Sequence, residues 1–479
     1  MSKSVIKNTS IGVIWIIIAR FSVQIISLLF LYILTRKIDP IDFGKAAIVI
    51  SLFNIYEGFY QFIYYNIILL KNLNKKIISA SLIISILISF LIIFFTYLIV
   101  LINKNFFTEF IILKNPTYLF LILIIGLSIN FKAILFKQLD FKYFAFTQSF
   151  SVILGTGFIS AIYAYYFNAD YNAILIGYSF YHIIELFLIL IRIKLRFDKF
   201  KISDVKKITS NGFTISLNYI VSKIALNGDY FIISSLFGPS ILGLYQKAYE
   251  LASKPINLIG NSLEKVGFAS INDYKPSRVE YFKLIYKSLY IISFFSFPIS
   301  SIIYLVSEYL IVFILGEKWK LTGELIAIIS WIIFFRISYK SLTSLFHVKS
   351  LFRSILYLQI IYAFNIILFA FLFSNLGIHY VAFSVVLATS LHFFACLFIL
   401  SYKIKFNFIK SLTGAIIGVT IAIVNIFIYY LISYYFNSNV ILTTLFSSIL
   451  TILLIIILEK IRPKTIIFLN IKSFIKNNN

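Results

Sequence analysis

Cysteine, histidine and the nucleotide-binding motifs are scarce or missing in this chain of 479 residues. The single cysteine, Cys396, excludes a disulfide within the chain. The four histidines, His182, His347, His379 and His392, lack the spacing of metal ligands, so no metal site is expected. No Walker loop, glycine-rich dinucleotide turn or nucleophile elbow occurs. We therefore expect no cofactor, no ATPase domain within this chain, and no enzyme activity.

Acidic residues are also few, because 18 Asp and Glu stand against 43 Lys and Arg. Hydrophobic residues make up 61% of the chain and charged residues 13%, which excludes a water-soluble globule. A net charge of +25 is also found in proteins that bind nucleic acid. Here the charges are spread over many short loops and no basic domain stands apart. We expect a membrane protein that does not bind nucleic acid.

Apolar runs of membrane-crossing length fill the chain. A span needs about 20 mainly apolar residues, and its backbone polar groups must be satisfied within the segment, so we expect helices. The runs predict about fourteen spans, at 11–35, 43–70, 77–102, 117–136, 144–167, 173–195, 209–236, 240–266, 282–312, 321–346, 351–373, 378–400, 413–436 and 440–458.

Lys and Arg lie mainly in the two terminal segments and in every second connection between the predicted spans. Cytoplasmic loops of membrane proteins carry the excess of Lys and Arg. Both termini are therefore predicted to be cytoplasmic. The same topology places Asp170 and Asn375 outside, and Lys201 and Lys275 inside.

The longest basic connection, near Lys194 to Lys207, divides the predicted spans into six before it and eight after. The hairpin turn P-I-D-F-G at 40–44 has a counterpart in P-S-I-L-G at 239–243, at the corresponding place of the second part. Six spans repeated in the same orientation form a parallel repeat, a common plan of transporters. We predict an all-α integral membrane protein with an N-lobe, a basic cytoplasmic linker, a C-lobe, and two extra spans with a basic tail. These regions are 1–195, 196–208, 209–400 and 401–479.

Polar and ionisable residues recur inside the spans. An ionisable residue in a span costs about 2.5–3.5 kcal/mol on insertion scales and faces a cavity or a partner. In the first two spans of each predicted lobe these residues share one helical face. They are either structural charge pairs or the lining of a hydrated cavity, and the two interpretations are compatible. The faces are Arg20, Gln24 and Ser27; Asn54, Glu57, Gln61 and Tyr64; Tyr219, Lys223, Asn227 and Tyr230; and Lys247, Glu250 and Lys254.

Distance from a hairpin turn predicts depth, because both helices of a hairpin rise about 1.5 Å per residue. Arg20 and Glu57 lie at matching distances from the turn beside Pro40. Asp229 and Lys247 do so about the turn at 238–239. Each pair is predicted to meet across its hairpin.

Three cations, Lys223, Lys254 and Arg336, are left without an obvious carboxylate at matching depth. Surplus cations deep in a cavity suit an anionic substrate, because phosphate pairs well with Arg and Lys. Snorkelling to the membrane interface is the alternative, chiefly for Lys254. Glu185 with His182 is either a buried polar contact or a titrating pair that couples transport to an ion gradient.

Several segments match the motifs of one family. They are I-D-P-I-D-F-G at 38–44, L-D-F-K at 139–142, F-G-P-S-I-L-G-L-Y at 237–245 with Ala248, Tyr249 and Pro255, and I-L-G-E-K-W at 314–319. Together they resemble the Wzx-type polysaccharide flippases of the multidrug/oligosaccharidyl-lipid/polysaccharide exporter superfamily. The resemblance covers most of residues 5–345. It departs at 57–62, where E-G-F-Y-Q-F stands in place of a Gly-rich run that the family often has.

The resemblance implies two six-helix lobes, a central cavity, alternating access and two extra C-terminal helices. It implies the flipping of undecaprenyl-pyrophosphate-linked oligosaccharide repeat units across a bacterial inner membrane, with membrane lipids and polysaccharide polymerase or export machinery as further partners. The sugar, the coupling ion and the oligomeric state stay open. We expect substrate contacts from Arg20, Lys223, Lys247, Arg336, Gln24, Asn54, Gln61 and Asn227, and ion coupling or charge pairing from Glu57, Glu185, Asp229 and Glu250.

Three alternatives remain. A multidrug or lipid II exporter of the same superfamily would share the fold. An O-antigen polymerase or ligase needs a catalytic site outside the bilayer, and the outer loops are too short to build one. A structural scaffold is disfavoured by the charged faces inside the spans.

Overall fold

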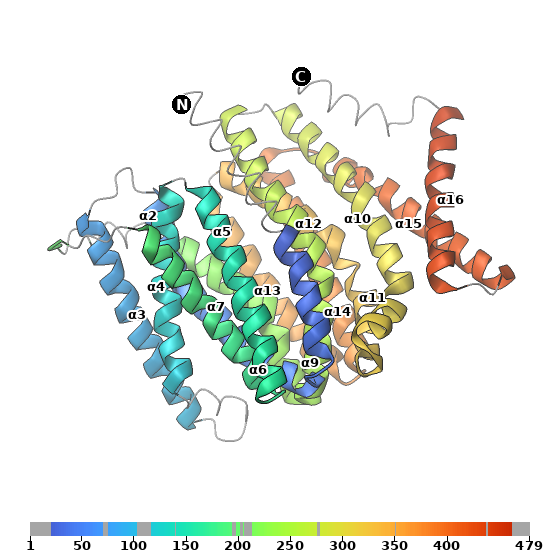
Figure 1. Cartoon of the computed structure of the whole chain (residues 1–479). Helices are drawn as coiled ribbons and strands as arrows, with labels where there is room; N and C mark the ends of the chain where they lie inside the picture. The colour runs from blue at the N-terminus through green and yellow to red at the C-terminus, as the bar shows by residue number, and fades with distance from the viewer. Residues whose placement is uncertain are drawn as a thin grey trace. The chain divides into compact units, whose positions relative to one another are not determined.

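The described part of the chain is helical throughout its regular structure (Figure 1). The computed structural model describes residues 21–69, 75–102, 116–138, 140–193, 198–201, 205, 213–274, 278–349, 351–436 and 439–461. No strand occurs within these residues, which confirms the prediction of an all-α fold.

Sixteen helical elements follow a first helix, Phe21–Thr35. They are α2 (Pro40–Leu69), α3 (Lys75–Ile102), α4 (Pro116–Lys137), α5 (Phe141–Val152), the π-helix η2 (Ile153–Ile159), α6 (Ser160–Tyr166), α7 (Tyr171–Arg192), α9 (Phe213–Tyr274), α10 (Arg278–Leu315), the 3₁₀-helix η3 (Glu317–Trp319), α11 (Lys320–Ile329), α12 (Ile332–Val348), α13 (Phe352–Ser374), α14 (Ile378–Ile404), α15 (Phe408–Phe436) and α16 (Val440–Ile461).

Nine described helices are long and apolar enough to cross a membrane, or up to ten if the pair α11 and α12, bent by 51°, is one span. This count takes α9 as one helix, but Gly238 breaks α9 with φ 81° and ψ 169°. Only glycine adopts such a backbone readily, so the G-P turn makes two spans of α9. With α2 and the two shorter apolar helices included, the helices correspond to the predicted spans in order, and a multi-pass fold of about fourteen spans is confirmed.

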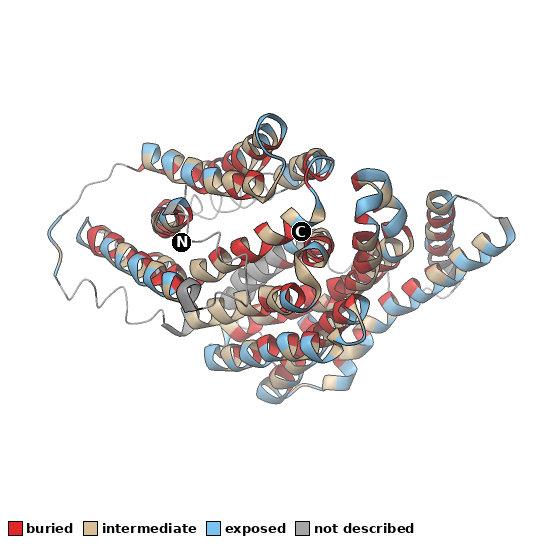
Figure 2. Cartoon of the chain, turned by 90° about the horizontal axis from the view of Figure 1, so that it is seen from below, coloured by how far each residue is buried: buried red, intermediate tan, exposed pale blue. Residues whose placement is uncertain are grey.

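Exposed positions recur along the helices (Figure 2), and many of them are large apolar residues. On α3, Leu87, Phe90 and Phe94 are more than half exposed. Water would penalise an apolar surface of this kind, whereas lipid does not. The exposed faces therefore identify a multi-pass membrane protein.

The contacts between backbones divide the chain into two compact units. Unit 1 is Met1–Lys247, Ile314–Trp319 and Phe352–Ser384, and unit 2 is Ala248–Phe313, Lys320–Leu351 and Val385–Asn479. Unit 1 thus contains all the described helices of the predicted N-lobe, together with the first part of α9, all of η3 and α13, and the first part of α14. The two six-helix lobes with a boundary at 196–208 stay a prediction.

Within unit 1, α4 packs on α2, α3 and α7. The ring of Tyr60 on α2 lies against Gly126 of α4, where any Cβ would overlap it. The Tyr60 hydroxyl bonds to Ser89 Oγ of α3 at 2.8 Å and donates to the Ile122 carbonyl of α4 at 3.3 Å. One buried tyrosine thus ties three spans together, and its hydroxyl has the partners that a polar group in lipid requires.

The two repeated P-x-x-x-G turns pack against each other. A Cβ added at Gly44 would overlap the carbonyl oxygen of Pro239, and a Cβ added at Gly243 would overlap that of Pro40. Each glycine therefore admits the backbone of the other turn. This reciprocal contact explains why both turns carry a glycine at the same place.

Candidate functional site

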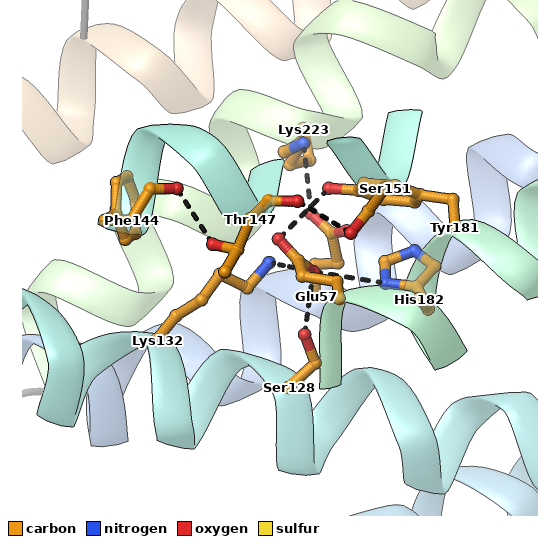
Figure 3. Close-up of polar contacts among 10 residues, drawn as sticks. Glu57, Ser128, Lys132, Phe144, Thr147, Ser151, Tyr181, His182 and Lys223 are labelled. Carbon is orange, nitrogen blue, oxygen red and sulfur yellow. Dashed lines mark hydrogen bonds and ion pairs between the residues drawn. The ribbon is translucent and has the colours of Figure 1, made fainter. Parts of the chain in front are cut away.

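A buried carboxylate on α7, Glu185, is the centre of a polar cluster inside unit 1 (Figure 3). Its Oε2 lies 2.9 Å from Lys132 Nζ and accepts a hydrogen bond from Ser128 Oγ at 2.8 Å. Tyr181 OH donates to Oε1 at 3.5 Å. His182 Nδ1 lies 4.0 Å from Oε2, so its contact with Glu185 is a long one.

The helices place these groups by their periodicity. Ser128 and Lys132 are four residues apart and share a face of α4. Tyr181 and Glu185 share a face of α7 in the same way. Because α4 packs on α7, the two faces meet. A buried ion is tolerated only when it is paired and its remaining lone pairs are satisfied, and this arrangement meets that condition for Glu185.

A second pair joins α2 and α9, where Lys223 Nζ lies 3.7 Å from Glu57 Oε2. These side chains are 20% and 19% exposed, so this pair is more accessible than the first. The close approach of the two helices depends on Gly58, which lies against the backbone and side chain of Ile220. Lys132 also interacts electrostatically with Glu57. The two pairs therefore form one network with two carboxylates and two ammonium groups.

This network corrects one prediction. Lys223 was expected to have no carboxylate at matching depth, but it pairs with Glu57. The membrane depth of two residues was compared only when one hairpin turn joins their helices, and no such turn joins α2 to α9. Arg20, the predicted partner of Glu57, lies outside the described residues, so that pair stays a prediction.

Sequence reasoning missed Lys132, the partner of Glu185. It falls within the predicted span 117–136 but was not among the ionisable residues singled out there. The available signal was its charge, because no other residue of 117–136 is charged.

The other predicted residues of unit 1 lie on the expected helices. Asp229 is buried, and its Oδ2 accepts a hydrogen bond from Tyr245 OH at 2.6 Å. The ammonium of Lys247 lies 4.8 Å from the centroid of the Phe43 ring. The pairing of Asp229 with Lys247 stays a prediction. Asn227 donates from Nδ2 to the Lys223 carbonyl at 2.8 Å, and Gln24, Asn54 and Gln61 are partly buried.

A separate polar group lies in unit 2, where Arg336 of α12 is buried. Its Nη2 donates to the hydroxyl of Tyr249, and its Nη1 donates to Ser253 Oγ at 3.4 Å. The guanidinium carbon lies 4.8 Å from the centroid of the Tyr249 ring. Two hydroxyl groups thus orient the guanidinium. Glu250, the residue after Tyr249, is partly buried on the same helix.

No group of three His, Cys, Asp or Glu that could hold a metal ion occurs within the described residues. The site residues are instead ammonium, guanidinium, carboxylate, hydroxyl and amide groups. These can bind an anion, hydrogen-bond to hydroxyls and exchange protons.

Comparisons with known proteins identify the family. A model of the family described as polysaccharide biosynthesis protein matches residues 33–323, more than half of the chain. A protein of Klebsiella pneumoniae, described as an uncharacterized membrane protein in the cps region, is 21% identical over 329 residues. The match covers 64% of this chain and 64% of the length of that relative.

Solved structures share the fold. The lipid II flippase MurJ in its inward closed conformation matches with a TM-score of 0.76 at 18% identity, over 94% of this chain and 100% of that chain. An inward-facing MATE multidrug transporter of the MOP superfamily matches with a TM-score of 0.65 at 14% identity, over 81% and 98%. The resemblance drawn from the sequence motifs is confirmed: the fold is that of MOP-superfamily flippases and exporters, and the chain belongs to the polysaccharide biosynthesis protein family.

Proposed function

We propose that the chain flips undecaprenyl-pyrophosphate-linked oligosaccharide repeat units from the cytoplasmic to the periplasmic leaflet during the synthesis of a surface polysaccharide. The observation that carries this proposal is the family match over residues 33–323. A fold shared along 94% of the chain with a lipid II flippase supports it. Movement by alternating access and a location in the bacterial inner membrane belong to the same proposal.

Arg336 is the proposed contact for pyrophosphate. Guanidinium forms strong, charge-assisted hydrogen bonds to phosphate oxygens, and Tyr249 and Ser253 orient it. Amide and hydroxyl groups suit sugar hydroxyls. We assign the sugar contacts to Gln24, Asn54, Gln61 and Asn227, with Arg20 and Lys247 as further cations.

The pair of Lys223 and Glu57 provides a route to proton coupling. When Glu57 is ionised, it neutralises Lys223 at 3.7 Å. When Glu57 takes a proton, the charge of Lys223 becomes available to an anion, and the local net charge rises by one. Substrate binding and proton binding would then favour each other.

Flipping in proteoliposomes tests the function. Purified protein should move a pyrophosphate-linked oligosaccharide between leaflets, and Arg336→Ala should slow the movement more than it lowers the yield of folded protein. Arg336→Glu should be slower still, because a carboxylate repels pyrophosphate. Arg353, on α13, is exposed and serves as a matched control for the loss of one arginine. An unchanged leaflet distribution across imposed proton and sodium gradients would contradict the proposal.

A multidrug or lipid II exporter is the second candidate, favoured by the fold shared with MATE and MurJ structures. The substrate that the purified protein moves distinguishes these exporters from the proposed oligosaccharide flippase. Extrusion of a cationic dye by vesicles that do not flip the oligosaccharide would support a drug exporter. Flipping of lipid II alone would support a lipid II exporter.

The topology has its own test. Single cysteines at positions 170 and 201, introduced after Cys396 is replaced, should differ in labelling by an impermeant thiol reagent on intact cells. We expect labelling at 170 only. The reverse pattern would invert the assignment of both termini to the cytoplasm.

A further inference from the structure

A groove of ≈ 910 Å³ lies in unit 1 beside α4, between α3 and α7. The polar groups of the proposed transport site, at Glu57 and Glu185, do not line it. Its walls are aliphatic and aromatic, and comprise Leu82, Ile83 and Ile86 from α3, Leu127 and Phe131 from α4, and Leu190 from α7.

The groove occupies the depth of one leaflet. It begins at Ser79, close to the first residue of α3, and continues to Ile86. That segment of helix rises about 10 Å, within the roughly 15 Å that half of a hydrocarbon core about 30 Å thick provides. The predicted topology places this end of α3, α4 and α7 on the cytoplasmic side.

The side of the groove opens toward the lipid-facing surface of α3. Ile83 is 42% exposed, whereas its neighbour Leu82 is 7% exposed and belongs to the core. The next exposed residues along the same helix are Leu87 and Phe90. An occupant that enters from this side must therefore be a hydrocarbon chain.

Residues 198–201, called the strap below, lie at the end of the groove that is predicted to be cytoplasmic. The Asp198 backbone N–H donates to Ser79 Oγ at 3.0 Å, which fastens the strap to α3. Phe200 packs on the hydrophobic cluster of α3, α4 and α7. The strap therefore provides a rim where the apolar groove meets water.

This rim is rich in lysine. Lys199 and Asp198 line the groove, and three further described lysines are exposed: Lys75 and Lys76 at the start of α3, and Lys201 after Phe200. Basic pockets between transmembrane helices on the cytoplasmic side bind anionic lipid head groups. The combination is an apolar slot of one-leaflet depth that ends at a cationic rim.

We propose that this groove is a binding site for an anionic phospholipid of the cytoplasmic leaflet, with one acyl chain in the slot and the phosphate at the lysine rim. The lipid would brace α3 against α7 and hold the strap in place. The proposal goes beyond the transport function and does not depend on it.

Native mass spectrometry of the full chain with phosphatidylglycerol or phosphatidylcholine tests the head group. We expect phosphatidylglycerol to stay bound under conditions that remove phosphatidylcholine. Each lysine near an anionic surface contributes about fivefold in affinity, the equivalent of about 1 kcal/mol. The combined variant Lys75→Ala, Lys76→Ala, Lys199→Ala should therefore lose roughly a hundredfold. Equal retention of both lipids, or unchanged retention in the variant, would overturn the proposal.

Two further variants test the slot. Ile83→Trp fills it and should abolish selective retention, while Leu87→Trp, one turn further along α3 and outside the lining, should retain the lipid. Both proteins must elute as monodisperse folded species, and Leu87→Trp controls for the added ring. Loss of the lipid from both variants, or from neither, would contradict a specific slot.

A photoreactive residue at position 86 identifies the occupant directly. Cross-linking to an added phosphatidylglycerol is the expected result. Cross-linking to another segment of the same chain would assign the groove to the protein itself. Stronger retention of a polyprenyl phosphate than of phosphatidylglycerol would assign it to the transported lipid, and either outcome would overturn the proposal.

Discussion

Two ion pairs of unit 1 have nearly the same N–O distance, but one is buried and the other is exposed to solvent. Lys132 Nζ lies 2.9 Å from Glu185 Oε2, and Lys318 Nζ lies 2.7 Å from Asp39 Oδ1. The side chains of the first pair are 13% and 0% exposed, and those of the second are 71% and 57% exposed. From the distance alone, removing a partner of the second pair would be expected to cost more stability. Burial reverses that order, because removing one partner of a buried pair leaves an uncompensated charge in the protein interior.

The neighbourhood of each pair shows what else holds the helices. At the exposed pair, Trp319 is fully buried against Phe43, with ring centroids 5.2 Å apart, and its indole N–H donates to the Thr35 carbonyl at 3.4 Å. Apolar packing of Trp319 thus holds η3 in place, and the Lys318 pair contributes little to its stability. At the buried pair the polar groups lie inside the contact between α4 and α7, next to apolar residues such as Ile134 and Ile189.

The largest effect is expected from Lys132→Met. Glu185 would remain buried and charged without its partner, so the folded state should lose about 3–5 kcal/mol, and transport should be lost. Denaturation of the purified protein by sodium dodecyl sulfate in mixed micelles measures the stability.

The double variant Lys132→Met, Glu185→Met is the control for this prediction. Replacing both partners of a buried pair by apolar residues is often close to neutral. We expect the double variant to recover most of the stability and none of the transport. Additive losses from the two changes would show that the residues do not act as a pair.

Trp319→Ala tests the apolar packing beside the exposed pair of Lys318 and Asp39. The loss of a fully buried indole should destabilise the protein by about 3 kcal/mol, although the Lys318 pair beside it is left intact. The same denaturation measurement applies, with Trp331→Ala in unit 2 as a tryptophan control that is only partly buried. A loss no larger than that of the control would mean that packing does not hold η3.

The Glu57 and Lys223 pair should fall between the extremes. Glu57→Gln should cost between about 1 and about 3 kcal/mol, since the pair is only partly buried. Restored transport in the swapped variant Glu57→Lys, Lys223→Glu would show that the two charges act on each other. If the swap is as inactive as the single changes, the position of each charge matters more than the pairing.

The spans and the hairpin turns were predictable from the sequence, and the charge partners were not. A run of apolar residues identifies a span without reference to any other helix. The turns at Pro40 and Pro239 were recognised by their local sequence, and the structure adds that they meet through Gly44 and Gly243.

Partners on helices that no turn joins require knowledge of packing. Glu57 and Lys223 are separated by more than 160 residues, and Lys132 and Glu185 lie on α4 and α7. Depth read from a hairpin applies only to two neighbouring spans. The same limit explains why the groove between α3 and α7 was not foreseen, because its walls come from three helices and a strap.

The smallest effect is expected from Lys318→Ala. Exposed ion pairs contribute about 0–1 kcal/mol and weaken in salt, so the change in unfolding free energy should stay within about 1 kcal/mol despite the 2.7 Å contact. Lys318→Arg preserves the charge and serves as the matched control. Denaturation at low and high salt shows whether any loss of stability comes from the ion pair or from packing, since salt screens an ion pair and does not screen packing. If Lys318→Ala destabilised the protein as much as Lys132→Met does, burial would not be what distinguishes the two pairs.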